Sequence, residues 1–174
     1  MNILITGIPA VGKTTIAKEF EKFGFKVYND KDFITKKNSA IVKEYAHKLK
    51  DVDLLGFAKT VNSKFKAKSK AKNLVFEGII FPYCLKQLVI KFDYIFVLSF
   101  PEKKLRLRYK TRKYPEAKVL DNLFVQENNL IYKNILASVK KNDMPVIVEV
   151  PLSGKKDLDI TKIIDVIFST FSSI

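Results

Sequence analysis

Residues 2–15 read NILITGIPAVGKTT. The first five of these residues form a short apolar run, which predicts a buried β-strand. The residues that follow match G-x-x-x-x-G-K-[ST], a glycine-rich loop that joins a strand to a helix and surrounds a phosphate group. An accidental match is the alternative, but strand, loop and helix follow one another in the order that this motif requires.

Each residue type in this loop predicts a separate role in binding a nucleotide. Gly7 and Gly12 permit backbone angles that a side chain would forbid, so successive N–H groups can turn toward a phosphate. Lys13 brings a positive charge to the outer phosphates, and the Thr14 hydroxyl is suited to ligating Mg²⁺. The helix beginning near Lys13 adds its positive N-terminal end. We therefore expect a nucleotide-binding loop formed by Gly7, Ala10, Gly12, Lys13, Thr14 and Thr15.

The composition indicates one basic globular domain of 174 residues with a net charge of +14. No apolar run reaches the roughly 18 residues that span a membrane, and the only cysteine, Cys84, has no internal partner. These features favour a reducing cytoplasm. Of the 32 basic residues only three are arginine, and the densest lysine run covers residues 64–72. The lysines form either an ordinary solvated surface or a face that binds a polyanion such as RNA.

The three arginines lie close together, at positions 106, 108 and 112. A chain that otherwise uses lysine is expected to keep arginine where a planar fork must bind phosphate or carboxylate. Arg108 and Arg112 are one helical turn apart and share a face, whereas Arg106 points elsewhere. We expect Arg108 and Arg112 to stabilise a transferring phosphoryl group from a lid. A solvated basic helix is the alternative.

The rest of the chain alternates predicted strands with predicted helices. Strands are expected at residues 2–6, 25–28, 73–76, 92–99 and 145–150. Helices are expected at residues 13–23, 32–50, 52–68, 101–113, 115–141 and 159–171. This alternation predicts a three-layer α/β fold of the P-loop NTPase type, with an approximately five-stranded parallel sheet covered by helices on both faces. No linker or repeat divides residues 1–174, so we expect a single domain.

Three acidic residues follow predicted strands, at the edge where parallel sheets bind ligands. Glu77 is expected to complete the Mg²⁺ site with Thr14, although a surface glutamate is the alternative. Asp30 and Asp32 follow the second strand and either shape an acceptor site or cap a helix. His47 and Cys84 are expected to be structural.

With these motifs, the chain resembles the adenylate kinase isoenzyme 6 family, small P-loop nucleoside monophosphate kinases that also serve in small-ribosomal-subunit maturation. The resemblance rests on residues 5–15, on YIFVL at 94–98, and on LRYKTRKY at 107–114 with Lys118 and Asp121-Asn122 after it. It implies that Arg112 contacts ATP, that residues 111–121 form a short lid and that residues 30–54 bind the monophosphate. Gly154, in the loop after the fifth strand, is expected at the nucleotide as well. Ala10 stands where the family usually has glycine, and Glu77-Gly78-Ile79 replaces its aspartate and histidine.

The resulting hypothesis is a cytoplasmic adenylate kinase that transfers the γ-phosphoryl group of Mg-ATP to AMP, with broader nucleoside monophosphate kinase activity as an extension. One alternative is an ATPase that assists small-subunit ribosome assembly, with its lysine face bound to ribosomal RNA or a ribosomal protein. Another is a P-loop kinase of a different small metabolite, which the lysine-rich region of residues 30–54 permits. No membrane partner is expected.

Overall fold

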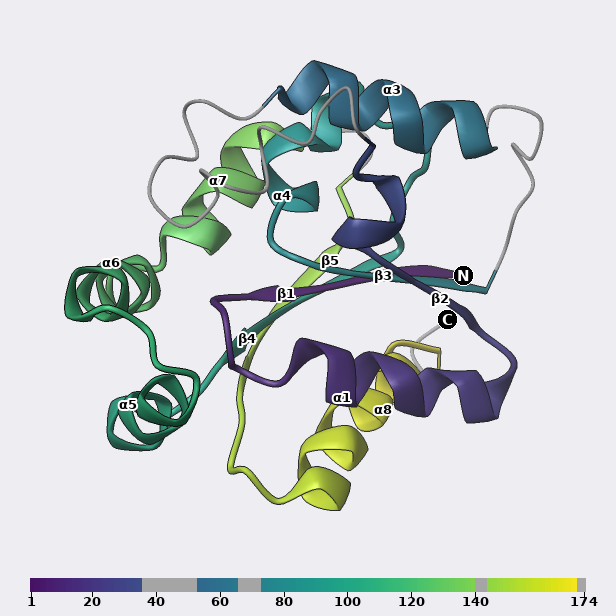
Figure 1. Ribbon diagram of the computed structural model, residues 1–174. Coiled ribbons are helices and arrows are strands. Elements are labelled where there is room, and N and C mark those ends of the chain that lie inside the picture. Colours follow the sequence, from purple (N-terminus) through teal and green to yellow (C-terminus); the bar gives the residue numbers. More distant parts are fainter. Residues whose placement is uncertain (36–52, 66–72, 140–143, 172–174) are drawn as a thin grey trace.

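The computed structural model describes residues 1–35, 53–65, 73–139 and 144–171. In these residues five parallel strands form one sheet in the order β2-β3-β1-β4-β5. Figure 1 shows α1 and α8 on one face of the sheet and α3, α4 and α7 on the other. The predicted three-layer α/β class is therefore confirmed. The strands are β1 (Asn2–Gly7), β2 (Lys26–Asn29), β3 (Leu74–Glu77), β4 (Tyr94–Ser99) and β5 (Val146–Pro151).

The helices follow the predicted alternation with strands. They are α1 (Lys13–Glu19), α3 (Leu54–Phe65), α4 (Phe81–Cys84), α5 (Glu102–Thr111), α6 (Glu116–Glu127), α7 (Leu130–Ser138) and α8 (Lys156–Phe171). Short 3₁₀ helices cover Phe20–Phe23, Asp30–Phe33 and Leu85–Gln87. None of the helices among the described residues is long and apolar enough to cross a membrane.

The three central strands explain the apolar runs in the sequence. Strands β3, β1 and β4 each have a strand on both sides and helices on both faces, and nearly all their residues are buried. Parallel strands in this position read as continuous apolar segments. Their carboxyl ends lie at one edge of the sheet, which brings the loop after β1 close to the last residue of β3.

An aromatic cluster anchors the segment that follows β2. The ring of Phe33, at the end of the 3₁₀ helix Asp30–Phe33, lies 6.1 Å from Phe57 and Phe76 and 5.9 Å from Phe81. Tyr28 stacks on Phe76 at 5.4 Å. Each such pair contributes about 0.5–1.5 kcal/mol beyond the burial of its area. The cluster therefore holds the start of the predicted acceptor region against β3 and α3.

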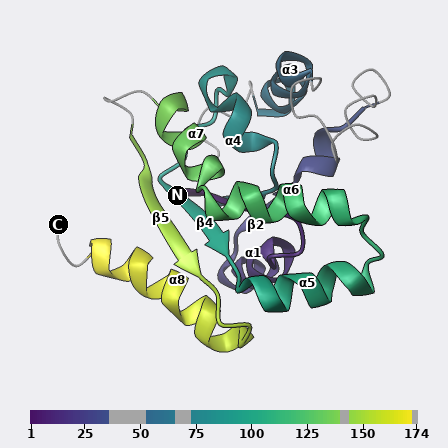
Figure 2. The same ribbon diagram turned by 90° about the vertical axis from the view of Figure 1, so that its left-hand side faces the viewer.

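The prediction of one long helix at residues 115–141 is wrong, because the chain forms two helices there, α6 and α7. The chain turns at Asn128 and Asn129, and Asn129 has a left-handed backbone with φ 52°. Asparagine tolerates this conformation better than most residues, and the Asn128 amide satisfies the carbonyl of Phe124. Figure 2 shows α6 lying beside α5, away from the line of α7. The two asparagines therefore redirect the chain.

Other differences from the sequence prediction are smaller. The first helix becomes 3₁₀ after Glu19 and ends at Gly24, which has the left-handed conformation expected of a cap. Helix α4 and the 3₁₀ turn after it were not predicted between the third and fourth strands. The last helix begins at Lys156 and not at Asp159. Residues 36–50 of the predicted helix 32–50, His47, and residues 66–72 of the lysine run lie outside the described residues.

Candidate active site

The predicted phosphate-binding loop joins β1 to α1 and contains three positive φ angles. Gly7 has φ 144° and Gly12 has φ 122°. A Cβ atom on Gly7 would lie 2.5 Å from the carbonyl oxygen of Leu98, so the position excludes other residues by space as well as by backbone angle. Ala10 has φ 64°, which is unfavourable for a residue with a Cβ atom. The loop is therefore strained at Ala10.

The Lys13 side chain folds back onto this loop. Its Nζ donates hydrogen bonds to the carbonyl oxygens of Gly7 and Ile8, both at 2.9 Å. Burial lowers the pKa of Lys13 to about 8, and the nearby carboxylates of Glu77 and Asp30 oppose that shift. A phosphate would offer the ammonium a charged acceptor, which makes a stronger hydrogen bond than a carbonyl does.

Thr14 and Glu77, the two predicted magnesium ligands, contact each other. Thr14 Oγ1 donates to Glu77 Oε1 at 2.7 Å, and Asn29 Nδ2 donates to the same oxygen. Glu77 is the last residue of β3 and is only 2% exposed. Asn29 was not among the predicted site residues, although the segment 29–32 was expected to cap a helix and Asn29 does cap the 3₁₀ helix Asp30–Phe33. The register of the strands reveals its position at the site, because Asn29 is the last residue of β2 and pairs directly with Glu77.

Asp30 and Asp32 lie in different surroundings. The Asp30 side chain is buried, and its Oδ2 accepts hydrogen bonds from the N–H groups of Ile79 at 2.6 Å and Ile80 at 3.2 Å. Its Oδ1 is buried and has no hydrogen-bond partner among the described residues. Burial raises the pKa of Asp30 to about 7, against the effect of these hydrogen bonds. Asp32 is exposed and accepts from the N–H of Asn29 at 2.7 Å, as a helix cap does.

A cavity of about 270 Å³ lies on one side of the loop. We call it the acceptor-side cavity because it includes the start of the predicted monophosphate-binding region. Asp30 lines it and Asp32 does not. The cavity brings together Pro9, Ala10, Gly12, Lys13, Thr14, Thr15, Asn29, Asp30, Lys31, Ile34, Glu77, Gly78, Ile79, Ile80 and Arg112.

Helix α5 docks on the loop through Arg108 and Tyr109. Nη1 of Arg108 donates to the carbonyl oxygens of Ala10 at 2.7 Å and Val11 at 3.1 Å. The guanidinium carbon lies 3.9 Å from the centre of the Phe100 ring, a cation–π distance. The hydroxyl of Tyr109 donates to the carbonyl of Pro9 at 2.9 Å. These contacts hold α5 against the back of the loop.

Arg106 and Arg112 both belong to α5 or its C-terminal cap, but they have different surroundings. Arg106 is exposed and pairs with Glu102 at 2.7 Å and Glu116 at 3.1 Å, so it points away from the loop as expected. Arg112 is the last residue of the arginine segment and caps α5. It lines the acceptor-side cavity and also a second cavity on the other side of the loop. The segment predicted as a lid, residues 111–121, consists of the C-terminal end of α5, the turn after it and the first half of α6.

The second cavity, which we call the donor-side cavity, has a volume of about 290 Å³. Gly154 lies in its wall with φ 85°, and a Cβ atom there would be 3.1 Å from the Phe100 ring. The loop after β5 and the phosphate-binding loop therefore line the same cavity, although they are far apart in sequence. Its lining consists of Ala10, Val11, Gly12, Thr15, Ile16, Phe100, Arg108, Arg112, Leu152, Gly154, Lys156 and Asp159.

Asp159 organises the wall of the donor-side cavity and was not singled out from the sequence. Its carboxylate is 3% exposed and accepts from the N–H of Ser153 at 2.7 Å, the hydroxyl of Ser153 at 2.8 Å and the N–H of Gly154 at 2.9 Å. Three donors on one buried carboxylate fix the conformation of residues 153–154. The available sequence signal was only a serine and an aspartate near the start of the last helix.

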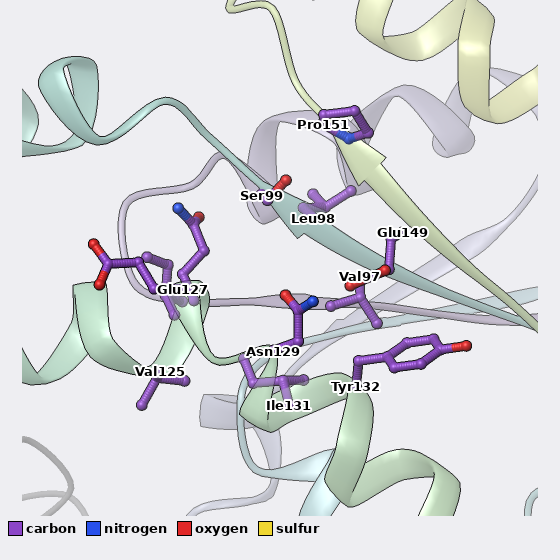
Figure 3. Close-up of a pocket in the computed structure, with 12 residues that line it drawn as sticks. Val97, Leu98, Ser99, Val125, Glu127, Asn129, Ile131, Tyr132, Glu149 and Pro151 are labelled. Carbon is purple, nitrogen blue, oxygen red and sulfur yellow. The ribbon is translucent and has the colours of Figure 1, made fainter.

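The largest cavity among these, about 490 Å³, lies elsewhere. It is a hollow between the turn from α6 to α7 and the carboxyl ends of β4 and β5, as Figure 3 shows. Asn129 of the turn and Tyr132 of α7 line it on one side, and Glu149 and Pro151 of β5 line it on the other. No predicted site residue lines it, and Ile8 is its only residue from the phosphate-binding loop.

Comparisons with known proteins agree with this architecture. A family model described as "AAA domain" matches residues 3–130. A protein from Thermococcus kodakarensis named "Putative adenylate kinase" is 31% identical over 156 residues, which cover 89% of this chain and 78% of the relative. A relative from Pyrococcus furiosus with the same name is 31% identical over 89% of this chain and 77% of its own length.

A solved structure shows the same fold at low sequence identity. The deoxyadenosine kinase from M. mycoides, solved with bound dATP, superposes with a TM-score of 0.59 at 18% identity, covering 96% of this chain and 99% of that one. Likeness at this identity concerns the fold alone. The chain therefore belongs to the P-loop family that the AAA-domain model describes, together with its adenylate kinase relatives.

Proposed function

We propose that this protein is an adenylate kinase that transfers the γ-phosphoryl group of ATP to AMP. The observation that carries the proposal is the pair of cavities on opposite sides of the phosphate-binding loop, both bordered by Arg112. A phosphoryl transfer needs donor and acceptor aligned on either side of the migrating group. The choice of AMP as the acceptor rests on the name of the relatives, "Putative adenylate kinase". The resemblance to the isoenzyme 6 family agrees with this choice.

The donor-side cavity suits the nucleoside of ATP. Phe100, Leu152 and the ordered backbone at Gly154 give it apolar and polar walls close to the loop. Purine rings bind in such clefts through apolar contact and a few fixed polar groups. The triphosphate would then run over the loop toward Lys13, with Thr15 beside it.

The pair formed by Thr14 and Glu77 suits a magnesium ion. Both side chains offer oxygen atoms, which Mg²⁺ prefers, and they are already in contact. In the part of the chain that the structure describes, no three His, Cys, Asp or Glu side chains are placed to hold a metal by themselves. Mg²⁺ takes one or two protein ligands and completes its shell with water and phosphate, so the oxygens of Thr14 and Glu77 are sufficient ligands. When bound, the ion neutralises charge on the phosphate oxygens.

Catalysis in this proposal is positioning and electrostatics. Lys13 leaves the carbonyls of Gly7 and Ile8 for the phosphates, and Arg112 reaches the transferring group from between the two cavities. Arg108 holds the loop from behind through Ala10 and Val11. It therefore acts on the reaction through the loop in the arrangement seen here.

A coupled assay of ADP formation from ATP and AMP tests the proposal. We expect turnover by the wild type and a loss on the order of 10²- to 10³-fold in Lys13→Ala, the size typical of removing one charge-stabilising donor. Arg106→Ala is the matched control, because that side chain pairs only with Glu102 and Glu116 among its described contacts. Wild-type protein without AMP turnover, assayed also with other nucleoside monophosphates, contradicts the proposal.

Asp30 supports a second candidate function, phosphorylation of a hydroxyl group on a small metabolite. An attacking hydroxyl must lose a proton, for which a nearby carboxylate is a suitable base. The phosphate of AMP needs no base and is repelled by a carboxylate. Turnover of a sugar, polyol or nucleoside in place of AMP, abolished by Asp30→Asn, favours this candidate. Turnover of AMP that Asp30→Asn leaves unchanged contradicts it.

A further inference from the structure

The side chain of Asn29 lies where two parallel strands end together. Asn29 is the last residue of β2, Glu77 is the last residue of β3, and the two are direct partners in the strand register. This register places an amide beside a buried carboxylate at the edge of the sheet that carries the phosphate-binding loop. Asn29 also lines the acceptor-side cavity.

The orientation of the Asn29 amide follows from its partners. Its Oδ1 accepts a hydrogen bond from the N–H of Lys31 at 2.9 Å, and its Nδ2 donates to Glu77 Oε1. A backbone N–H can only donate and a carboxylate oxygen can only accept, so the two ends of the amide cannot be exchanged. Asn29 is therefore held between the first turn of the 3₁₀ helix Asp30–Phe33 and Glu77.

Two donors converge on one oxygen of Glu77. Thr14 Oγ1 reaches Oε1 at 2.7 Å and Asn29 Nδ2 reaches it as well. All the hydrogen bonds that described side chains make to this carboxylate end on Oε1. The carboxylate is thereby held through this one oxygen by two side chains from different elements. A carboxylate fixed in this way needs no reorganisation when a cation or its water shell binds.

We propose that Asn29 is a positioning residue that orients Glu77 for the magnesium ion of Mg-ATP. The inference rests on the proposed function, since it requires a Mg²⁺-dependent nucleotide site at Thr14 and Glu77. Asn29 does not touch the reacting groups in this account. It acts through Glu77, and it ties that carboxylate to the first residues of the acceptor region.

Asn29 could also serve only as the cap of the 3₁₀ helix. Substitutions that keep the cap distinguish this structural role from the proposed positioning role. Aspartate and serine cap helices about as well as asparagine does. Neither can donate to Glu77 as the Asn29 amide does, because aspartate lacks a donor and serine is too short. Asn62→Ala is the matched control. Its amide also joins two groups, donating to the carbonyl of Gln87 at 2.7 Å and accepting from the N–H of Val89 at 2.8 Å, and it does not line either cavity.

The experiment measures the dissociation constant of a fluorescent ATP analogue in Mg²⁺ and in EDTA, without turnover. The ratio of the two constants reports how strongly the ion contributes to binding. We expect Asn29→Asp and Asn29→Ser to reduce this ratio about tenfold, the size of one hydrogen bond to a charged group, while binding in EDTA stays within about twofold. Asn62→Ala keeps the wild-type ratio.

Two results overturn the inference and are distinct from each other. A wild-type ratio in Asn29→Ser shows that the donor is dispensable, whatever the added charge of Asn29→Asp does. A wild-type protein whose affinity for the ATP analogue does not depend on Mg²⁺ overturns the proposed function at this site, and the inference with it. Thermal melting identifies any variant that is unfolded. If Asn29→Ser is unfolded, Asn29→Thr, which also caps helices and adds no charge, replaces it and decides.

Discussion

The donor-side and acceptor-side cavities differ in how completely their polar groups are satisfied. On the donor side, Asp159 accepts three hydrogen bonds and Arg108 donates two. On the acceptor side, Asp30 has one buried oxygen without a partner among the described residues, and burial raises its pKa to about 7. Buried polar atoms are rarely left unpaired in proteins. Among the described residues, the polar groups of the donor side are therefore paired with one another, whereas the acceptor side has a buried carboxylate oxygen that no described residue pairs with.

The first test of this contrast is a substitution of Arg112, which lines both cavities. We expect Arg112→Ala to lower turnover on the order of 10²-fold, because a guanidinium between donor and acceptor stabilises the charge of the transferring group. Steady-state kinetics with ATP and AMP measure it, with Arg106→Ala within about twofold of wild type as the control. Equal effects of the two substitutions would mean that the arginines act only through general surface charge.

The second test concerns the donor side. Asp159→Ala should reduce the free energy of unfolding by about 3 kcal/mol, because three donors lose a buried charged acceptor. It should also raise the KM for ATP without changing the KM for the acceptor. Denaturant unfolding and initial rates measure the two effects. An equal rise in both KM values would contradict the separation of the two sides.

The third test uses the pH dependence of Asp30. Its pKa in the folded protein, about 7, lies above the ordinary value of 3.8, so the folded state keeps a proton that the unfolded state has lost. The stability from this group is thus present below about pH 4 and is lost as the pH rises to 7. Between pH 5 and pH 8, Asp30→Asn should gain about 2–3 kcal/mol relative to wild type, at about 1.4 kcal/mol for each pH unit. Denaturant unfolding at both pH values measures it, and parallel curves would contradict it.

The smallest expected effect is at Ala10, which the two cavities share. Ala10→Gly removes the strain of a left-handed alanine but adds flexibility to the unfolded chain, so the free energy of unfolding should rise by less than about 1 kcal/mol. Thermal melting measures the change. A clear loss of stability would show that the alanine methyl group contributes more by its burial than the strain costs.

Local sequence signals predicted the strands and the phosphate-binding loop better than the residues that join distant parts of the chain around the two cavities. Glycine spacing and the lysine of the phosphate-binding loop are local signals, and the apolar runs at residues 2–6 and 92–99 predicted central strands correctly. Asn29 and Asp159 depend on strand register and loop closure, which join residues distant in the chain. The left-handed Asn129 that divides α6 from α7 lies within a sequence that is helical in its periodicity.

The lysine-rich region stays a prediction. Only Lys64 and Phe65 of the run 64–72 are among the described residues, and Lys64 lies over the rings of Tyr28 and Phe33 at 4.6 Å and 5.0 Å. That lysine packs against the aromatic cluster that supports the acceptor side. The ribosome-assembly hypothesis therefore rests on the composition and the family resemblance alone.

Binding of diadenosine pentaphosphate tests the central claim most directly, because this molecule joins an ATP-like end to an AMP-like end. We expect one molecule to bind per chain in calorimetry and to compete with both ATP and AMP. Arg112→Ala should weaken the binding of diadenosine pentaphosphate more than it weakens the binding of ATP alone. Binding that competes with ATP but not with AMP, with no contribution from Arg112, would contradict the assignment of donor and acceptor to the two cavities.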